Sequence, residues 1–537
     1  MKDIIHDFLI VGSGMSSVHA AQTLVESGKK VTIIDFGTTS QNKLITNPSK
    51  NFYNLRSQDK DQYKYFLGKN LEGIIWQSSK NLLTPERQYI LKGADSYLPY
   101  QSKNFNLIQS LARGGLGNAW GAGASPYTTD ELNAIGLPPL EMQKSYVTIS
   151  KRIGLNGSFD DADIFFNKKD LKFDDPLKID PTLLGVYNTY TKSKKSFNSK
   201  GIYFGRTPLA VISKNKNKRS AYNYRNMDFY DDIGGSVYRP WMTLDKLNNS
   251  ELFTYIPNAL VLKFSEKIGF TEVVYKDMKS GDKRSAKCKV LLLGAGVTST
   301  ARIVLRSFDS KEELPILTNG YSTKAFLRVN SIGSSMKDNK NSLGQMEMFY
   351  KYNNEPLKTS MASLYTYSSL MLSKLIKETP YLGFSYGRKL MAYLQPALVI
   401  ASINHPDTYA DGNVLKLVKS SNLFTGDKIV INYNRRMMRS IDKHAVSMFT
   451  NALFKTGCLP LAENKMDPGS AVHYAGTLPF NSTSKKFYLN IDGKLNCTSN
   501  VYVIDGSGFK FLPANGISFS LMANADRIAR LLIEKKK

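Results

Sequence analysis

The sequence predicts an α/β fold, α+β overall when the whole chain is considered, and three observations indicate this class. Two strand–glycine–helix junctions lie near residues 12 and 294, and short strand patterns follow one another over residues 252–293. The stretches 151–240 and 311–460 have mixed patterns rich in tyrosine and phenylalanine. Because 537 residues exceed what one compact core usually contains, we expect two or three structural units.

The first junction opens the chain as a βαβ unit. Residues 8–11 form an apolar run typical of a buried strand, residues 16–27 place apolar side chains on one helical face, and residues 31–34 form a second strand pattern. The turn between the first strand and the helix is Gly12-Ser13-Gly14-Met15-Ser16-Ser17.

The spacing in this turn is what a dinucleotide-binding unit requires. Gly12 permits a tight turn, and Gly14 lets the backbone approach a pyrophosphate at the helix N-terminus, beside Ser16. Ser17 replaces the usual third glycine and is small enough for close helix–strand packing. Asp35 follows Gly14 by 35 − 14 = 21 residues, where an acidic side chain can bond ribose hydroxyls. We therefore predict a bound dinucleotide; the alternative for Asp35 is an ordinary strand-end residue.

A second glycine-rich segment spans residues 113–123, with five glycines in eleven residues. Such a composition disfavours a helix or strand interior and favours close approach of the backbone to a ligand. A flexible loop is the alternative. Residues 40–105 before it have no clear period, and we expect loops and short elements there.

The strand series ends at the second junction. Strands are predicted over 252–255, 259–264, 271–275 and 289–293, with a helix over 297–305. Ala295 and Gly296 lie between the last strand and the helix. Two such junctions in one chain indicate two halves of one dinucleotide domain.

Apolar residues between 361 and 403 have two interpretations. Met361–Lys377 has near-helical apolar spacing, and Tyr381–Ile403 is aromatic and aliphatic with the basic residues Arg388 and Lys389. A core helix followed by a strand is one interpretation. A membrane-contacting or lipid-binding flap is the other.

Two further motifs lie near the C-terminus. The first is His473-Tyr474-Ala475-Gly476-Thr477, and the second is Val503-Ile504-Asp505-Gly506-Ser507 followed by Leu512-Pro513-Ala514-Asn515. A helical pattern then runs from Gly516 to Leu532. Together with the glycine segments and in the same order, these motifs resemble the glucose–methanol–choline (GMC) oxidoreductases, nearest the pyranose-oxidase-like and bacterial sugar-dehydrogenase branch.

The resemblance implies a Rossmann-like FAD-binding domain of the glutathione-reductase type, discontinuous in sequence, over residues 1–150, 241–310 and 461–537. Residues 151–240 and 311–460 would form a substrate domain, built on a mainly antiparallel sheet plus helices. Some relatives attach the flavin to a histidine just before the tryptophan of the glycine-rich loop. Ala119 stands at that place, so we expect FAD to be bound non-covalently.

The resemblance also implies residue roles. His473 would be the general base, since a neutral imidazole can take a hydroxyl proton, and Asn515 would orient the substrate oxygen. The resemblance implies flavin contacts from the glycine-rich loop, the second junction and the C-terminal motifs, and it places the backbone of Val261 near the adenine. The contact residues are Gly114, Gly115, Asn118, Ala295, Gly296, Asp505, Gly506, Asn515, Gly516 and Ile517.

The function implied is FAD-dependent oxidation of a CH–OH group on a sugar-like or polyhydroxylated substrate, by hydride transfer to flavin N5. The electron acceptor stays open. The alternatives are a redox-neutral FAD-dependent isomerase, and an oxidoreductase for a lipid-linked or sterol-like alcohol at a membrane surface.

The composition limits which partners and which cellular location we expect. The 72 Lys and Arg against 45 Asp and Glu leave a net charge of +27, which suits an anionic or lipid-linked glycan or a peripheral membrane contact; a merely solvated basic surface is equally compatible. The basic residues are dispersed without a finger or RNP motif, so a nucleic acid partner is not expected. Three separated cysteines favour a reducing cytoplasm and predict no metal site, and any contact with the inner membrane face would be peripheral.

Overall fold

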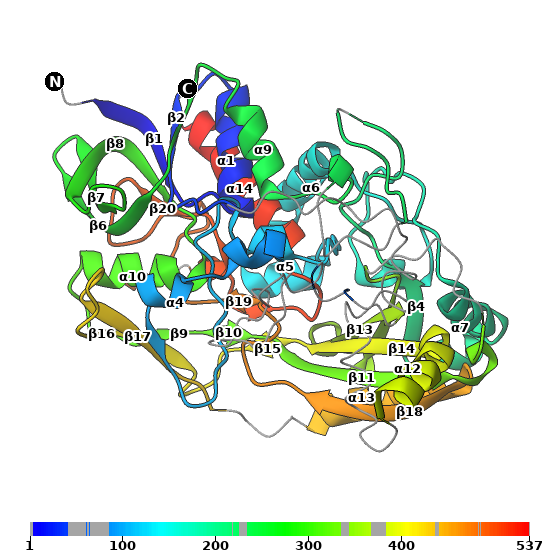
Figure 1. Cartoon of the computed structure of the whole chain (residues 1–537). Coiled ribbons are helices and arrows are strands. Elements are labelled where there is room, and N and C mark those ends of the chain that lie inside the picture. Colours follow the sequence, from blue (N-terminus) through cyan, green and yellow to red (C-terminus); the bar gives the residue numbers. More distant parts are fainter. Residues whose placement is uncertain are drawn as a thin grey trace.

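The computed structural model describes residues 4–40, 61, 64, 85–216, 218–224, 233–334, 343–366, 383–434, 440–481, 483 and 485–535. These residues form a mixed α/β structure with a mainly parallel sheet and helices in one part and an antiparallel sheet in the other (Figure 1). The predicted α/β class is therefore confirmed. The division into two sequence-discontinuous domains stays a prediction.

The parallel part of the first sheet has the strand order β5-β2-β1-β8-β20. Its strands are β1 (Ile5–Val11), β2 (Val31–Ile34), β5 (Phe253–Ile256), β8 (Lys283–Leu293) and β20 (Val501–Val503). Val11 lies opposite Ile34 on one side and Leu293 on the other. Both strand–glycine–helix junctions therefore begin at the same edge of this sheet.

Helices cover both faces of this sheet, which explains why its strands are apolar throughout. Phe8 and Ile10 pack into one core cluster, whereas Leu9 and Val11 pack into another on the opposite face. The helices around it are α1 (Met15–Glu26), α6 (Pro139–Ile153), α9 (Pro240–Leu247), α10 (Val297–Ser307) and α14 (Ser518–Glu534) (Figure 1). The first half of β8 pairs antiparallel with β7 (Phe270–Asp277), which in turn pairs antiparallel with β6 (Ala259–Lys267).

The second sheet is antiparallel, with the order β18-β11-β14-β13-β12-β4. Its strands are β4 (Ile202–Arg206), β11 (Gly320–Arg328), β12 (Met346–Lys351), β13 (Thr359–Thr366), β14 (Leu398–His405) and β18 (Cys458–Lys465). Its apolar face packs against α7 (Pro181–Lys192) and α13 (Ser440–Lys455). β18 crosses the domain boundary that we predicted at residue 460.

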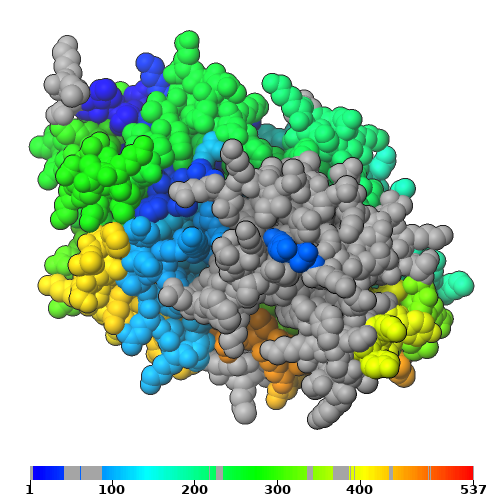
Figure 2. Space-filling view, in the orientation of Figure 1, coloured from blue at the N-terminus to red at the C-terminus, as the bar shows by residue number. Residues whose placement is uncertain are grey.

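Smaller elements connect the two sheets. The strands β3 (Tyr100–Gln101), β17 (Asp427–Asn432), β16 (Val414–Lys419) and β9 (Leu314–Pro315) form a four-stranded sheet. Figure 2 shows the light-blue surface that includes β3 beside the yellow surface that includes β16 and β17. The remaining elements are α4 (Ala94–Tyr97), α5 (Thr129–Ile135), α8 (Lys194–Asn198), α12 (Gly383–Leu394) and the short pairs β10 (Leu317–Thr318) with β19 (Tyr474–Ala475) and β15 (Asp407–Thr408) with β21 (Phe511–Leu512).

The predicted helix over Met361–Lys377 is wrong at its start. Residues 359–366 form β13, because they pair with β12 on one side and β14 on the other. Residues 367–382 lie outside the described residues, and α12 and β14 follow. Much of the loop segment predicted over 40–105 also lies outside them; from Pro85 it contains the 3-10 turn Pro85–Ile90, α4 and β3.

No helix in the described part of the chain combines the length and the apolar composition needed to cross a membrane.

Candidate functional site

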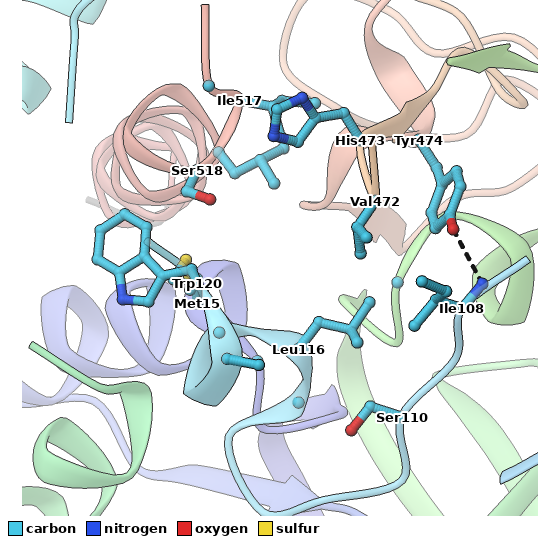
Figure 3. A pocket seen from close by; sticks show the side chains of 18 of the residues that line it. Met15, Ile108, Ser110, Leu116, Trp120, Val472, His473, Tyr474, Ile517 and Ser518 are labelled. Atoms are coloured by element: carbon cyan, nitrogen blue, oxygen red, sulfur yellow. Dashed lines mark hydrogen bonds between the residues drawn. The ribbon is translucent and has the colours of Figure 1, made fainter. Parts of the chain in front are cut away.

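A cavity of about 860 Å³ extends from the two glycine junctions of the parallel sheet to the polar face of the antiparallel sheet. Gly12 to Ser16 and Gly294 to Ser299 line one end, and side chains of β12, β13 and β14 line the other. Figure 3 shows the middle of this cavity, where Met15, Leu116, Trp120, His473 and Ile517 surround an open space.

The two glycines of the first turn differ in backbone conformation and in their surroundings. Gly12 has a φ of +90°, and a Cβ atom there would lie 2.8 Å from the Gly294 carbonyl oxygen. Gly14 has an ordinary φ of −67°, and a Cβ atom would meet nothing within 4 Å in the described structure. Gly121 and Gly123 share this combination of ordinary φ and open space, and all three line the cavity. Neither backbone strain nor packing explains these three glycines, and each leaves open space in the cavity wall.

Three helix N-termini meet at the cavity. Residues that line it include Met15 and Ser16 of α1, Thr298 and Ser299 of α10, and Ser518 of α14. Among the described residues, none of the three helices has a side-chain cap or an acidic residue in its first turn. The N–H groups of the first turns and the positive ends of the helix dipoles therefore favour negative charge in the cavity, and at α10 the Asp505 carboxyl already accepts a bond from the Gly296 amide.

Asp35 is held in place at the end of β2. The hydroxyls of Ser13 and Tyr255 both donate to its Oδ2 atom, at 2.5 and 2.9 Å. Ser13 Oγ also accepts a hydrogen bond from the Gly114 amide at 2.9 Å, which ties the first turn to the glycine-rich loop. Burial raises the pKa of Asp35 to about 6, and the two hydroxyl bonds oppose this shift. The carboxyl therefore lines the cavity in a fixed orientation.

The glycine-rich loop forms a 3-10 turn over Gly115–Ala119 and packs on the first turn. A Cβ atom at Gly115 would lie 3.6 Å from the Gly14 Cα atom. Asn118 donates from Nδ2 to the Arg113 carbonyl oxygen at 2.8 Å, and it fills the space beside Gly114. Asn118 and Gly114 thus shape the loop, while Gly115 lies at the cavity.

Asp505 joins the second junction to the C-terminal segment. Its Oδ2 atom accepts hydrogen bonds from the Gly296 amide at 3.0 Å and from Thr300 Oγ1 at 2.6 Å. Its Oδ1 atom accepts a bond from the Ser507 amide at 3.0 Å. Burial raises the pKa of this carboxyl, which nevertheless lines the cavity. Asp505 therefore fixes where α10 begins.

His473 lies in the cavity wall with one ring nitrogen anchored. Its Nδ1 atom is 2.8 Å from Asn319 Oδ1. The Nδ2 atom of Asn319 donates to the carbonyl oxygens of His405 and Pro513, at 2.8 and 2.9 Å, so its Oδ1 atom must be the acceptor toward His473. His473 Nδ1 therefore carries the proton, and Nε2 has the free lone pair. Burial lowers the pKa of His473 to about 4, which keeps the ring neutral at pH 7.

The residues on either side of His473 restrain it. Val472 has a φ of +59°, an outlier for a β-branched residue, and such strain tends to occur at functional sites. The Tyr474 hydroxyl accepts a bond from the Ile108 amide and donates one to the Gly469 carbonyl oxygen, both at 2.9 Å. Figure 3 shows the imidazole of His473 pointing into the cavity between these two side chains and Ile517.

Most of the sequence-predicted site residues line this cavity: Gly12, Gly14, Ser16, Asp35, Gly115, Ala295, Gly296, His473, Asp505, Gly506, Gly516 and Ile517. Among the described residues, the lining does not include Ser17, Gly114, Asn118, Val261 or Asn515. Ser17 donates to the Gly294 carbonyl oxygen at 3.2 Å, Val261 is buried in β6, and Asn515 is buried one residue before Gly516.

The sequence prediction missed Ser13, Tyr255, Asn319 and Glu347. Glu347 had a signal, because it is a lone acid between two methionines in an apolar strand. Asn319 had none, because its bond to His473 joins residues 154 positions apart.

Within the described ranges, no group of three or more His, Cys, Asp or Glu side chains could hold a metal ion. A scan against protein-family models and a search of curated proteins found no match to this chain.

Proposed function

We propose that this cavity binds FAD non-covalently and that the protein oxidises a CH–OH group of a sugar-like or polyhydroxylated substrate, with His473 as the general base. The observation that carries the proposal is a neutral, anchored imidazole whose Nε2 lone pair lies in a cavity lined by glycines and helix N-termini. A base of this kind can take a hydroxyl proton.

The first end of the cavity suits a dinucleotide. Parallel strands in the order β5-β2-β1-β8 with helices on both faces support a Rossmann-like, glutathione-reductase-type domain. Gly14 and the N-terminus of α1 would receive the pyrophosphate, and Asp35 would bond the ribose hydroxyls. A volume of about 860 Å³ is within the usual size of a cofactor site. Ala119 lines the cavity without a nucleophile, which supports non-covalent binding.

The middle of the cavity suits the reaction. FAD bound there would supply the hydride acceptor. His473 Nε2 would take the hydroxyl proton, and Asn319 would hold the ring in the tautomer that leaves Nε2 free. The N-terminus of α14 at Gly516 and Ile517 would stabilise negative charge on the ring system. Asn515 stays the predicted orienting residue.

The test is anaerobic mixing of the purified protein with sugars and polyols while the visible flavin spectrum is recorded. Alcohol oxidation should bleach the flavin stoichiometrically. His473→Gln should keep the flavin and slow its reduction by roughly 10²–10⁴-fold. Because the pKa of His473 is lowered to about 4, reduction should persist in mild acid and fail only as the pH falls through about 4.

The matched control is His444→Gln, which replaces an exposed histidine of α13. The flavin of this variant should be reduced as fast as that of the unsubstituted protein. A colourless protein, or a flavin that no alcohol reduces, would contradict the proposal. Product formation without bleaching would favour the isomerase instead.

A further inference from the structure

The wall of the cavity that the antiparallel sheet contributes is polar. Alternate side chains of β13, namely Met361, Ser363 and Tyr365, line the cavity, whereas Ala362 and Leu364 belong to the core beneath α7 and α13. This alternation is the period of two that a strand imposes. One face of the sheet is therefore apolar core, and the other is available to a ligand.

Neighbouring strands extend this polar wall. Glu347 of β12 lies directly opposite Ser363, and Asn404 of β14 lies opposite Met361. Thr207, which follows β4, also lines the cavity. All three added side chains are buried, with exposed fractions of 3, 7 and 6% for Glu347, Asn404 and Thr207.

Each of these three residues leaves a polar atom unsatisfied. In the described part of the chain, Glu347 Oε2, Asn404 Oδ1 and Thr207 Oγ1 are buried and have no hydrogen-bond partner. Buried polar atoms are rarely left without partners in folded proteins. Three of them in one cavity wall leave that wall with hydrogen-bonding capacity that no described residue uses.

The charge on this wall is low. Burial raises the pKa of Glu347 to about 8, aided by Asp160, while Lys168 and a hydrogen bond from Ser125 act in the opposite direction. Tyr365 from β13 also faces this carboxyl, and burial raises the pKa of its phenol to about 12. Glu347 and Tyr365 are therefore uncharged at neutral pH.

Two cationic side chains in the described part of the chain bear on this charge, Lys168 and Arg87, and both are hydrogen-bonded to other groups. The Lys168 ammonium donates to Asp163 Oδ1 at 2.5 Å and to the Ser158 carbonyl oxygen at 2.8 Å. Among the described residues that line the cavity, Arg87 is the one cation, and it donates to the Asn118 carbonyl oxygen at 3.4 Å in the glycine-rich loop. Within the described residues, the sheet wall thus offers no counter-charge to an anionic substrate.

We propose that this wall is a subsite for an uncharged polyhydroxylated substrate, a neutral sugar or alditol, and that Glu347 determines specificity there as a carboxylic acid that both donates and accepts a hydrogen bond. The inference rests on the proposed function and narrows its substrate class. A hydroxyl can donate to Asn404 Oδ1 and accept from Glu347. A phosphate or uronate would be buried without a counter-charge, which is costly.

The test measures ligand binding to the purified holo-protein by calorimetry and by the shift of the flavin spectrum. The probes are a panel of uncharged hexoses, pentoses and alditols, with uronates and hexose monophosphates as charged probes and propanol as the single-hydroxyl probe. The variants are Glu347→Leu and Glu347→Gln. Glu131→Gln is the matched control, because Glu131 is another buried carboxyl with a pKa raised to about 7, but it lies in α5 in a capping box with Thr128.

At least one uncharged polyol should bind roughly tenfold or more tightly than its charged analogues and propanol, because a site built for hydroxyls rejects ligands that lack them. Binding should weaken from about pH 6 to about pH 9 as Glu347 ionises. Glu347→Leu should weaken binding at least about tenfold, and Glu347→Gln should do so less and remove the pH dependence. Glu131→Gln should change neither the affinity for the polyol nor its pH dependence.

Three outcomes would each overturn the inference. No uncharged probe binds, or the charged probes or propanol bind equally well, or Glu347→Leu binds the polyol as tightly as the unsubstituted protein. Failure of the proposed function looks different, since a protein without flavin can still be tested for polyol binding by calorimetry. A flavin that propanol reduces as readily as sugars would keep the proposed reaction and remove the subsite.

Discussion

His473 and Glu347 titrate on opposite sides of neutrality, although they line the same cavity. Burial penalises the charged form of each, so the pKa of the imidazole falls to about 4 and the pKa of the carboxyl rises to about 8. Both side chains are therefore uncharged at pH 7. A neutral imidazole and a neutral carboxyl in one cavity would suit a substrate that enters uncharged and loses a proton only at the reacting hydroxyl.

The raised pKa of Glu347 makes stability depend on pH. Its unfolded pKa is about 4.5 and its folded pKa about 8, so the folded protein binds more protons between these values, and stability falls as the pH rises through them. Glu347→Gln removes this loss. In thermal unfolding without substrate, the free energy of unfolding of the variant should gain on that of the unsubstituted protein by about 3–4 kcal/mol between about pH 5 and about pH 8. A difference that stays constant over that range would contradict the burial of a neutral carboxyl.

At the scale of one element, each end of α1 carries a glycine, and the two glycines have different surroundings. Gly14 is the residue before the first helical turn, and open cavity space lies where its side chain would be. Gly28 follows the last turn of the same helix with a φ of +78°, where glycine is needed for the backbone. One helix therefore begins at a glycine with open cavity space beside it and ends at a glycine that its backbone conformation requires.

Substitution at these two positions should separate binding from stability. Gly14→Val and Gly28→Ala should each cost about 1 kcal/mol of folding free energy. Only Gly14→Val places methyl groups in the cavity, so it should weaken flavin binding by roughly a hundredfold or more, whereas Gly28→Ala should be purified with its flavin. The measurement is flavin content after dialysis, beside the melting temperature of each variant. Retention of flavin by Gly14→Val would show that the first turn does not contact the cofactor.

At the scale of the whole molecule, one buried ion cluster connects the parallel sheet unit to the four-stranded sheet. Asp427 of β17 accepts bonds from Arg302 at 3.1 Å and from Arg306 at 2.7 and 2.8 Å, both on α10. Arg302 also donates to the Pro99 carbonyl oxygen beside β3 at 2.9 Å. The cluster thus fixes α10, whose first turn lines the cavity, against β17, a strand more than a hundred residues later in the chain.

Asp427→Asn should destabilise the protein by about 3–5 kcal/mol, because it leaves the buried guanidinium group of Arg302 and the partly buried one of Arg306 without their counter-charge. The check is the free energy of unfolding in urea at neutral pH. Glu313→Gln is the control, since Glu313 pairs with Lys416 at 2.8 Å where both side chains are about half exposed, and its loss should cost less than about 1 kcal/mol. Equal effects of the two substitutions would mean that the cluster is not buried in solution.

The local sequence was enough to determine the α/β class, the strands and helices at both junctions, and the glycines and Asp35 that line one end of the cavity. Turn chemistry and apolar period act over a few residues, so they can be seen in the chain itself. The near-helical apolar spacing after Met361 predicted a helix, whereas the structure has the strand β13 there. Pairing with a strand on each side overrides the local helical propensity. Only the tertiary structure decided that Asn319 orients His473, that Glu347 stays neutral, and that Asn515 is buried outside the cavity lining. Those properties come from burial and from contacts between distant segments, which no local pattern encodes.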